Sequence, residues 1–513
     1  MRYGFVIDHR RCIGCHACTV ACKEENRVPL GAARTWVKYV EKGTWPDTRR
    51  YFSVLRCNHC DAAPCVTICP TVALYRRADG IVDFDGERCI GCKSCMQACP
   101  YDALYIDPDT NTAAKCHYCA HRVEVGLEPA CVVVCPEQAI IAGDLDDPRS
   151  RIARLVAREQ VEVRKPEQGT RPKVFYVGAE SSTLTPSLQR PEAGYLWGQR
   201  PAAEADLIRM VADLHARERG GDGALSRTVY DAPHAPRPWG GKVGAYLWTK
   251  SVAAGALLVA AVGELVGEAG GGWLSGVMAP LTALVFLALT TALLVFDLKR
   301  PDRFHYILLK GNPRSWLVWG AWILMAYGVV AAAWLAAGLA GAPAVIQALA
   351  VPALLLAAAT AGYSALLFGQ AEGRDFWQSP LHLPHLLAGA VAAGAAVLIV
   401  LQVLTAPAEA RAIGVDLLRR ALVAGLAAHA GLLALDLFGH HAGVDVARAA
   451  RLITEGAWAP RFWGGVVAGG IALPLLLAWW GPAGAAAAAL LALAGLWLYE
   501  DLWVKAGQSI PLS

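Results

Sequence analysis

The chain has 513 residues, enough for two or three domains, and its net charge of +4 gives no basis for binding nucleic acid. Hydrophobic residues make up 55% of the sequence and the mean hydropathy is +0.36, which is above the average of soluble proteins. These apolar residues are concentrated after about residue 240. We therefore expect a polar domain first and a membrane domain after it.

Residues 3–7 alternate in hydropathy like a short strand and lead into the first of four cysteine groups. All sixteen cysteines lie between Cys12 and Cys135, and three of the groups end in Cys-Pro. The first and third groups have the spacing C-x2-C-x2-C-x3-C, whereas the second and fourth contain a wider gap. The groups are Cys12, Cys15, Cys18 and Cys22; Cys57, Cys60, Cys65 and Cys69; Cys89, Cys92, Cys95 and Cys99; and Cys116, Cys119, Cys131 and Cys135.

This spacing indicates iron–sulfur clusters. A C-x2-C-x2-C loop wraps three thiolates around three irons of one cubane, and the fourth cysteine ligates the other cluster of a pair. Sixteen thiolates therefore predict four [4Fe-4S] clusters with no ligand left over. Disulfides at this density are typical of small secreted domains. Zinc ribbons pair two C-x2-C units instead of placing four cysteines in one short loop.

The strand and cysteine loop at the start of the chain return at residues 82–92, which indicates an internal repeat. A helical turn and a strand are expected at 101–107. This order is that of a bacterial dicluster ferredoxin, and one such unit is inserted between the halves of another. The predicted fold is a tandem ferredoxin-like α+β domain followed by an all-α membrane bundle.

The cysteine pattern resembles the four-cluster electron-transfer subunits of molybdopterin oxidoreductases, such as those of dimethyl sulfoxide reductase and polysulfide reductase. The resemblance covers about residues 1–190. It implies that each cluster takes three ligands from one group and the fourth from another. The implied sets are Cys12, Cys15 and Cys18 with Cys135; Cys116, Cys119 and Cys131 with Cys22; Cys57, Cys60 and Cys65 with Cys99; and Cys89, Cys92 and Cys95 with Cys69.

Residues 191–243 are expected to join the two domains, after a strand at 172–177. A helix at about 202–218 carries apolar residues on one face, which predicts that it packs against the iron–sulfur domain. The Gly- and Pro-rich stretch at 220–238 predicts an extended linker.

The membrane domain is expected at residues 244–505. About eight apolar stretches are long enough to cross a bilayer, which needs roughly 20 residues each. They lie near 245–266, 275–298, 315–338, 344–368, 385–405, 417–438, 462–480 and 482–500.

Residues 297–304, Asp-Leu-Lys-Arg-Pro-Asp-Arg-Phe, follow the second stretch. They resemble an element of the NrfD-like (polysulfide reductase type) membrane subunits, which interact with quinones. Trp-Thr-Lys-Ser at 248–251 and the loop from Arg374 to Pro384 fit the same family. The resemblance covers about residues 240–505. Because the two halves are usually separate proteins, the sequence looks like their fusion.

A quinone, menaquinone or ubiquinone, needs an apolar slot for its tail, donors at its carbonyl oxygens and a supply of protons. Lys250 lies one to two turns inside a spanning helix, where a cation is costly unless it faces protein or water. The candidate quinone-binding residues, all on the side of the iron–sulfur domain, are Lys250, Asp297, Arg300, Arg303, His305 and Arg374. Two alternatives remain open: Lys250 snorkels to the surface, or the arginines and Asp297 pair to stabilise their loop.

Asp436, inside the sixth stretch, is a candidate for a proton path. His385 and His429 raise the possibility of a haem with two histidine ligands. We place these two histidines at different depths in the membrane, so no haem is expected.

The chain is expected to be a multi-pass protein of the inner (cytoplasmic) membrane. Arginine and lysine are concentrated in the connections on the iron–sulfur side, which predicts that this side is cytoplasmic. The first residues show no apolar leader, which agrees with cluster loading in the cytosol. Relatives of the family often carry the iron–sulfur subunit on the outer face, so the opposite orientation stays open.

No molybdopterin, flavin or nucleotide motif is visible in the sequence. We therefore expect an electron-transfer and membrane-anchor subunit that connects the quinone pool to a molybdopterin-type catalytic subunit on another polypeptide. One alternative is the same module in a hydrogenase or cytochrome complex. The other is a subunit of a redox-driven proton pump.

Overall fold

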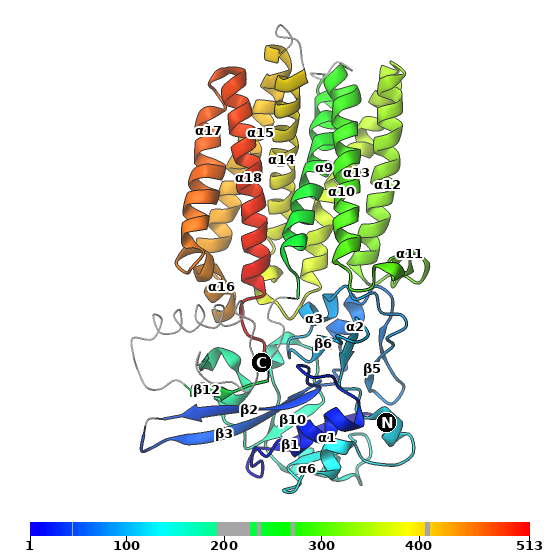
Figure 1. Cartoon of the computed structure of the whole chain (residues 1–513), viewed down its shortest axis with the longest axis vertical. Coiled ribbons are helices and arrows are strands. Elements are labelled where there is room, and N and C mark those ends of the chain that lie inside the picture. The colour runs from blue at the N-terminus through cyan, green and yellow to red at the C-terminus, as the bar shows by residue number, and fades with distance from the viewer. Residues whose placement is uncertain (44, 192–225, 233–237, 268–271, 406–410) are drawn as a thin grey trace.

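The computed structural model describes residues 1–43, 45–191, 226–232, 238–267, 272–405 and 411–513. It consists of an α+β domain that lies against one end of a bundle of long helices (Figure 1). The helix expected at 202–218 lies outside the described residues.

The outer part of the α+β domain is a four-stranded sheet in the order β8-β1-β10-β9. Strand β1 (Tyr3–Asp8) pairs antiparallel with β8 (Ile140–Asp144) and parallel with β10 (Val174–Val177), and β9 (Val161–Glu162) completes the edge. The strands expected from the sequence at 3–7 and 172–177 are therefore present. Because β1 and β8 flank the first and last cysteine groups, these two groups share one half of the domain.

Two hairpins form the inner part of the domain. They are β4 (Leu74–Arg76) with β5 (Val82–Phe84), and β6 (Leu104–Ile106) with β7 (Ala113–Lys115). The second and third cysteine groups share one hydrophobic core with these hairpins. The inner unit is thus inserted between the halves of the outer one.

A second four-stranded sheet has the order β11-β12-β2-β3. Its strands are β2 (Thr35–Lys42), β3 (Arg49–Arg56), β11 (Gln189–Pro191) and β12 (Ser226–Tyr230). The sequence places β12 in an extended linker, but in the structure it pairs with β2, and the Arg227 guanidinium lies 2.6 Å from the Glu41 carboxylate. This part of the expected linker therefore belongs to the iron–sulfur domain.

Short helices fill the connections of the α+β domain. They are α1 (Ala17–Glu25), α2 (Pro64–Ile68), α3 (Ser94–Ala98), α4 (Ala120–Val123), α5 (Ala130–Val133), α6 (Arg151–Arg158), α7 (Ser181–Leu184) and the 3-10 turns Pro166–Gln168 and Pro186–Leu188.

In the described part of the chain, seven helices are long and apolar enough to cross a membrane. They are α9 (Gly241–Leu265), α10 (Ala279–Asp297, preceded by a π-helical turn Leu274–Met278), α12 (Trp316–Leu339), α13 (Pro343–Gly369), α14 (His382–Thr405), α15 (Arg411–Phe438) and α18 (Gly481–Gly507). The chain is therefore a multi-pass membrane protein.

The expected stretch at 462–480 forms a shorter helix, Arg461–Leu477, so the bundle agrees roughly with the eight expected helices. Its first part, Arg461–Ala472, is π-helical and continues into α17 (Leu473–Leu477). The short helices α11 (Tyr306–Leu309) and α16 (Val444–Thr454) and the 3-10 turns Pro301–Arg303 and Asp375–Gln378 lie in connections on the iron–sulfur side.

Helix α9 is the most buried of the long helices and packs against α10, α13, α14 and α18. Small residues allow this packing. A Cβ on Gly255 would lie 1.8 Å from the carbonyl oxygen of Ala390, and one on Gly394 would lie 2.0 Å from the carbonyl carbon of Gly255. Close backbone contact through small residues is typical of membrane helices, and here it fixes the position of Lys250 on α9.

We expect Gly255→Ala to destabilise the bundle by about 1–3 kcal/mol, because the added methyl group must push α9 and α14 apart. Thermal unfolding of the purified protein in detergent measures this loss. Gly431→Ala is the matched control, because a Cβ there, on exposed α15, meets nothing within 4 Å. Equal melting temperatures for Gly255→Ala and the parent would contradict the close contact.

Candidate iron–sulfur and membrane sites

The first and third cysteine groups adopt the same loop conformation. Gly14 and Gly91 have φ values of +72° and +69°, and the residue after the second cysteine, His16 or Lys93, has a φ of 61° or 64°. A helix then begins and carries the third cysteine. These left-handed positions wrap the loop so that three thiols converge on one side, and glycine adopts such a φ without steric cost.

The thiols of the chain gather into four quartets. Cys12, Cys15, Cys18 and Cys135 line one pocket, and Cys69, Cys89, Cys92 and Cys95 line another. The remaining thiols form two sets by their mutual electrostatic contacts: Cys22 with Cys116, Cys119 and Cys131, and Cys65 with Cys57, Cys60 and Cys99. The amide of Asn26 lies 3.7 Å from the sulfurs of both Cys22 and Cys119, which agrees with the assignment of these two cysteines to one quartet.

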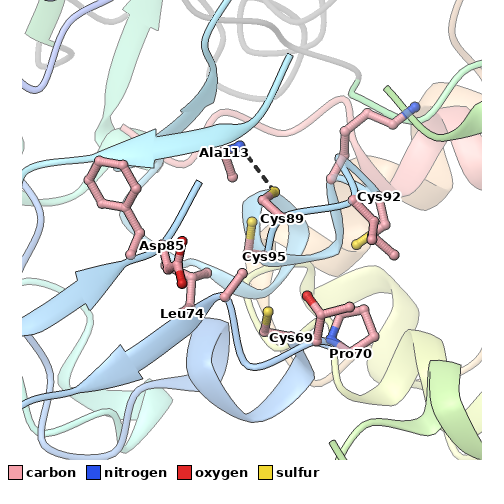
Figure 2. Close-up of a pocket in the computed structure, with 13 residues that line it drawn as sticks. Cys69, Pro70, Leu74, Asp85, Cys89, Cys92, Cys95 and Ala113 are labelled. Carbon is pink, nitrogen blue, oxygen red and sulfur yellow. Dashed lines mark hydrogen bonds between the residues drawn. The ribbon is translucent and has the colours of Figure 1, made fainter. Parts of the chain in front are cut away.

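Figure 2 shows the quartet of Cys69, Cys89, Cys92 and Cys95 around its pocket. Backbone amides donate hydrogen bonds to the sulfur of Cys89, from Gly91 at 3.4 Å and from Ala113 at 3.3 Å. Cys135 receives a similar bond from the amide of Ala139 at 3.2 Å. Such bonds stabilise a thiolate, and hydrogen bonds to the sulfurs are among the groups that set cluster potentials.

The residues around the quartets fit anionic clusters. Burial, with repulsion from neighbouring thiols, raises the pKa of Cys18 to about 12, so metal binding has to drive its deprotonation. Arg56 is buried and donates to the sulfur of Cys131 at 3.2 Å, while its Nε and Nη2 atoms have no partner. A buried guanidinium without an acidic partner needs a nearby negative charge. In the part of the chain that the structure describes, no group of three or more His, Cys, Asp or Glu is placed to hold a single metal ion.

Donors of the membrane domain bind the backbone of the second and third cysteine groups. Trp239 Nε1 donates to the Cys92 carbonyl at 3.1 Å, Arg303 Nη1 to the Cys89 carbonyl at 3.2 Å, and Asn312 Nδ2 to the Cys69 carbonyl at 2.9 Å. The backbone amides of Lys299 and Arg300 add bonds to the carbonyls of Gly91 and Ile90. The quartet of Figure 2 is therefore in direct contact with the bundle.

Five of the six candidate quinone residues lie at this junction. Asp297 forms an ion pair with Lys93 at 2.8 Å, and Arg303 also donates to the Gly86 carbonyl at 2.6 Å. Arg300 pairs with Asp302 at 2.9 Å, and His305 is exposed beside Tyr306.

Arg374 is buried and donates to Gln97 Oε1 at 2.8 Å and to the Ile510 carbonyl at 3.1 Å. Burial lowers its pKa to about 10. Most of these contacts connect the two domains, which favours the structural alternative for Asp297, Arg303 and Arg374.

Lys250 lies apart from these residues, fully buried inside the bundle. Its ammonium donates to the Ala361 carbonyl at 2.6 Å and lies 5.0 Å from the centre of the Tyr363 ring. The carboxylate that acts on it electrostatically is Glu500 of α18, which is also buried. The side chain therefore does not snorkel: buried Lys250 on α9 donates to α13, and buried Glu500 on α18 acts on it electrostatically.

A group of buried rings next to this pair was not predicted from the sequence. His382 stacks on Trp503 with ring centres 3.9 Å apart, and His385 stacks on Tyr499 at 4.8 Å. Within the part of the chain that the structure describes, the ring nitrogens of His429 and the Nε2 atoms of His382 and His385 have no hydrogen-bond partner. The sequence signal was the presence of histidine in otherwise apolar helices, but their convergence depends on how α14, α15 and α18 pack.

The expectation that His385 and His429 lie at different depths is wrong. Their ring centres are 4.2 Å apart at an interplanar angle of 86°. Helices α14 and α15 run side by side and bring the two residues to the same level. Rings in such direct edge contact leave no space between them for a porphyrin iron, so the prediction that no haem binds is unchanged.

Asp436 lies near the end of α15 that faces the iron–sulfur domain. It accepts a hydrogen bond from Ser379 Oγ at 2.5 Å and acts electrostatically on Tyr499. It is thus half-buried between the connection before α14 and the histidine group. This position suits a proton donor.

Comparison with known proteins identifies both halves of the chain. Residues 232–508, more than half of the sequence, match the family described as "Polysulphide reductase, NrfD". Residues 48–145 match a 4Fe-4S dicluster domain, and residues 10–26 match a 4Fe-4S binding domain.

Similar curated proteins cover the iron–sulfur part. One subunit of the tetrathionate reductase of Salmonella typhimurium is 48% identical over 200 residues, which is 38% of this chain and 80% of the relative. The arsenate respiratory reductase iron-sulfur subunit ArrB of a Shewanella species is 35% identical, covering 34% of this chain and 96% of the relative. The thiosulfate reductase electron transfer subunit PhsB of Salmonella typhi is 45% identical, covering 31% of this chain and 84% of the relative.

We expect Arg303→Ala to expose the quartet of Figure 2 to solvent. The variant loses two charge-assisted bonds, to the carbonyls of Gly86 and Cys89, each worth about 1.5–3 kcal/mol, so local opening should become at least about a hundredfold more frequent. The rate at which a chelator removes iron measures the effect.

Arg300→Ala is the control, because the Arg300 guanidinium donates mainly to exposed Asp302. Equal rates of iron loss in the two variants would show that Arg303 does not protect the site.

Proposed function

Because the protein belongs to the polysulphide reductase NrfD family and joins that membrane domain to 4Fe-4S domains, we propose that it conducts electrons between a catalytic subunit and membrane quinone. Its similarity to subunits of tetrathionate, arsenate and thiosulfate reductases supports this role. The catalytic partner would be of the molybdopterin type, since relatives with this cysteine pattern serve such enzymes.

Each thiol quartet would hold one [4Fe-4S] cluster, four in all, and each cluster when bound accepts and passes on one electron at a time. The support is the gathering of sixteen thiols into four sets, the amide bonds to their sulfurs, and buried cations such as Arg56. The fourth ligand of each set comes from a different group than the first three, as in paired cubanes.

The contact of the bundle with the Cys69, Cys89 and Cys92 carbonyls carries the proposal, because a cluster in that quartet would be the membrane end of the electron path. The quartet of Cys12, Cys15, Cys18 and Cys135 lies in the half of the domain away from the bundle, and Cys15 is exposed (Figure 1). Ile13 and Val20, both more than half exposed, lie around it. This surface suits the catalytic partner.

The quinone would react near Lys250 and not at the outer loops. Lys250 and Glu500 are a buried donor and a buried acid, and Tyr363 and His382 are close to the lysine. A quinone carbonyl needs such a donor, and quinone reduction also consumes protons. Asp436, with Ser379 and the histidine group, would supply them from the iron–sulfur side.

A series of aromatic rings in contact runs from the membrane-side quartet to the surroundings of Lys250. Trp239, whose indole donates to the Cys92 carbonyl, stacks on Trp377 with ring centres 5.4 Å apart. Trp377 lies 5.9 Å from Trp503, on which His382 stacks. This series of rings supports a quinone site beside Lys250, where the series ends at His382.

The iron–sulfur side would be cytoplasmic. The loops on that side carry many cations, among them Lys299, Arg303, Lys310 and Arg314, whereas Arg419 and Arg420 lie toward the opposite end. The positive-inside rule then places the loops with more cations in the cytoplasm.

Anaerobically purified protein should contain about sixteen irons per polypeptide, from four [4Fe-4S] clusters. Addition of a ubiquinol or menaquinol analogue should change the redox state of these clusters, followed by their visible absorption and EPR spectra. Far fewer irons, or full clusters that exchange no electrons with any quinone analogue, would disprove the proposed function.

Lys250→Met should abolish quinone-dependent oxidation of the clusters while iron content stays unchanged, because methionine keeps the length but provides no donor. Stopped-flow absorbance of dithionite-reduced protein mixed with quinone measures the rate. Lys242→Met is the control, since that exposed lysine at the start of α9 donates only to the Phe296 carbonyl. An unaltered rate in Lys250→Met would rule this residue out.

A further inference from the structure

Arg56 is the last residue of β3 and directly precedes Cys57. Its side chain is 1% exposed, and the guanidinium lies 4.4 Å from the centre of the Phe5 ring. One nitrogen, Nη1, donates to the sulfur of Cys131 at 3.2 Å. The cation is thus held in the interior of the iron–sulfur domain, in contact with a thiol.

Three other buried cations of this domain have an acidic partner, whereas Lys115 and Arg164 donate to backbone carbonyls. Lys38 lies 3.4 Å from Asp231, Lys173 lies 3.4 Å from Asp61, and Lys93 lies 2.8 Å from Asp297. Among the described residues Arg56 has no carboxylate within 4.0 Å, and its Nε and Nη2 atoms have no hydrogen-bond partner. Since a buried guanidinium keeps its charge, its counter-charge has to come from the sulfur sites.

Two quartets surround this cation. The thiols that act on Arg56 electrostatically are those of Cys131, Cys116 and Cys18. Cys131 and Cys116 belong to the quartet with Cys22 and Cys119, whereas Cys18 belongs to the quartet with Cys12. Arg56 donates its hydrogen bond to Cys131, so its effect should be largest on the quartet of Cys22, Cys116, Cys119 and Cys131.

We propose that Arg56 sets the reduction potential of the cluster bound by Cys22, Cys116, Cys119 and Cys131. This rests on the proposed function, which places a [4Fe-4S] cluster in that quartet. A cluster with four thiolates is anionic and gains one further negative charge when one electron arrives from its neighbour. A fixed cation at its sulfur stabilises the reduced form and raises the potential, because net charge and hydrogen bonds to the sulfurs tune these clusters. Arg56 stays protonated throughout, so the step moves one electron and no proton.

The test compares three variants of the full-length protein in anaerobic redox titrations followed by EPR. Arg56→Met removes the charge and the donor at similar length, and Arg56→Lys keeps the charge. Arg49→Met, on the same strand with its guanidinium over the Tyr51 ring, is the control. Iron and acid-labile sulfide per polypeptide are measured in parallel.

In Arg56→Met we expect full iron content and one of four clusters at a lower potential. At fixed ambient potential its reduced-to-oxidised ratio should fall at least tenfold, which equals 59 mV for a one-electron couple. Arg56→Lys should shift less, and Arg49→Met should not shift. An unchanged set of potentials in Arg56→Met overturns the proposal, and so does loss of one cluster in both Arg56 variants with no shift in the others, because Arg56 would then only support the fold.

The proposed function fails separately. Parent protein with far fewer than about sixteen irons would refute the four-cluster assignment before any variant is made. Parent protein with four clusters that never react with quinone would refute the electron-transfer role and leave the potential of the Arg56 variants as a valid test.

Discussion

Three donors of the membrane domain, on Trp239, Arg303 and Asn312, bind the carbonyl oxygens of three cysteines in one quartet, and the arrangement of the whole molecule depends on these contacts. They hold a thiol site against the ends of the helices without using the sulfur atoms, which remain free to bind iron. Because the donors come from different connections of the bundle, the quartet is fixed in position and not only attached. A fixed distance between redox centres is what a protein contributes to electron transfer.

Charge is arranged on both sides of this junction to suit the chemistry proposed for each. In the iron–sulfur domain, buried cations such as Arg56 and Lys115 face sulfur or backbone carbonyls, which suits anionic clusters. In the bundle, the buried lysine Lys250 is acted on electrostatically by the buried Glu500. A buried pair of this kind costs desolvation free energy, and in a membrane such residues are usually functional.

The bundle contains a group of buried ionisable side chains. Lys250, Glu500 and three buried histidines lie on α9, α14, α15 and α18. The surrounding core consists of alanine, leucine and valine. Among the described residues, the ring nitrogens of His429 and the Nε2 atom of His385 have no hydrogen-bond partner.

The amino-acid sequence by itself determined the sulfur chemistry and the membrane character. Cysteine spacing is a local property of short loops, so the four groups, the strand at 3–7 and the positions of the long helices could be read directly from it. It did not determine which residues meet across the molecule. The outer loop arginine Arg303 proved to bind the cluster loop, β12 joined a sheet far from it in sequence, and His385 met His429. Such contacts depend on how helices and strands pack, because a residue's partners inside a folded protein come from segments distant in the sequence. Only the tertiary structure therefore decided which thiol quartet faces the membrane domain and which carboxylate, Glu500, lies near the buried Lys250.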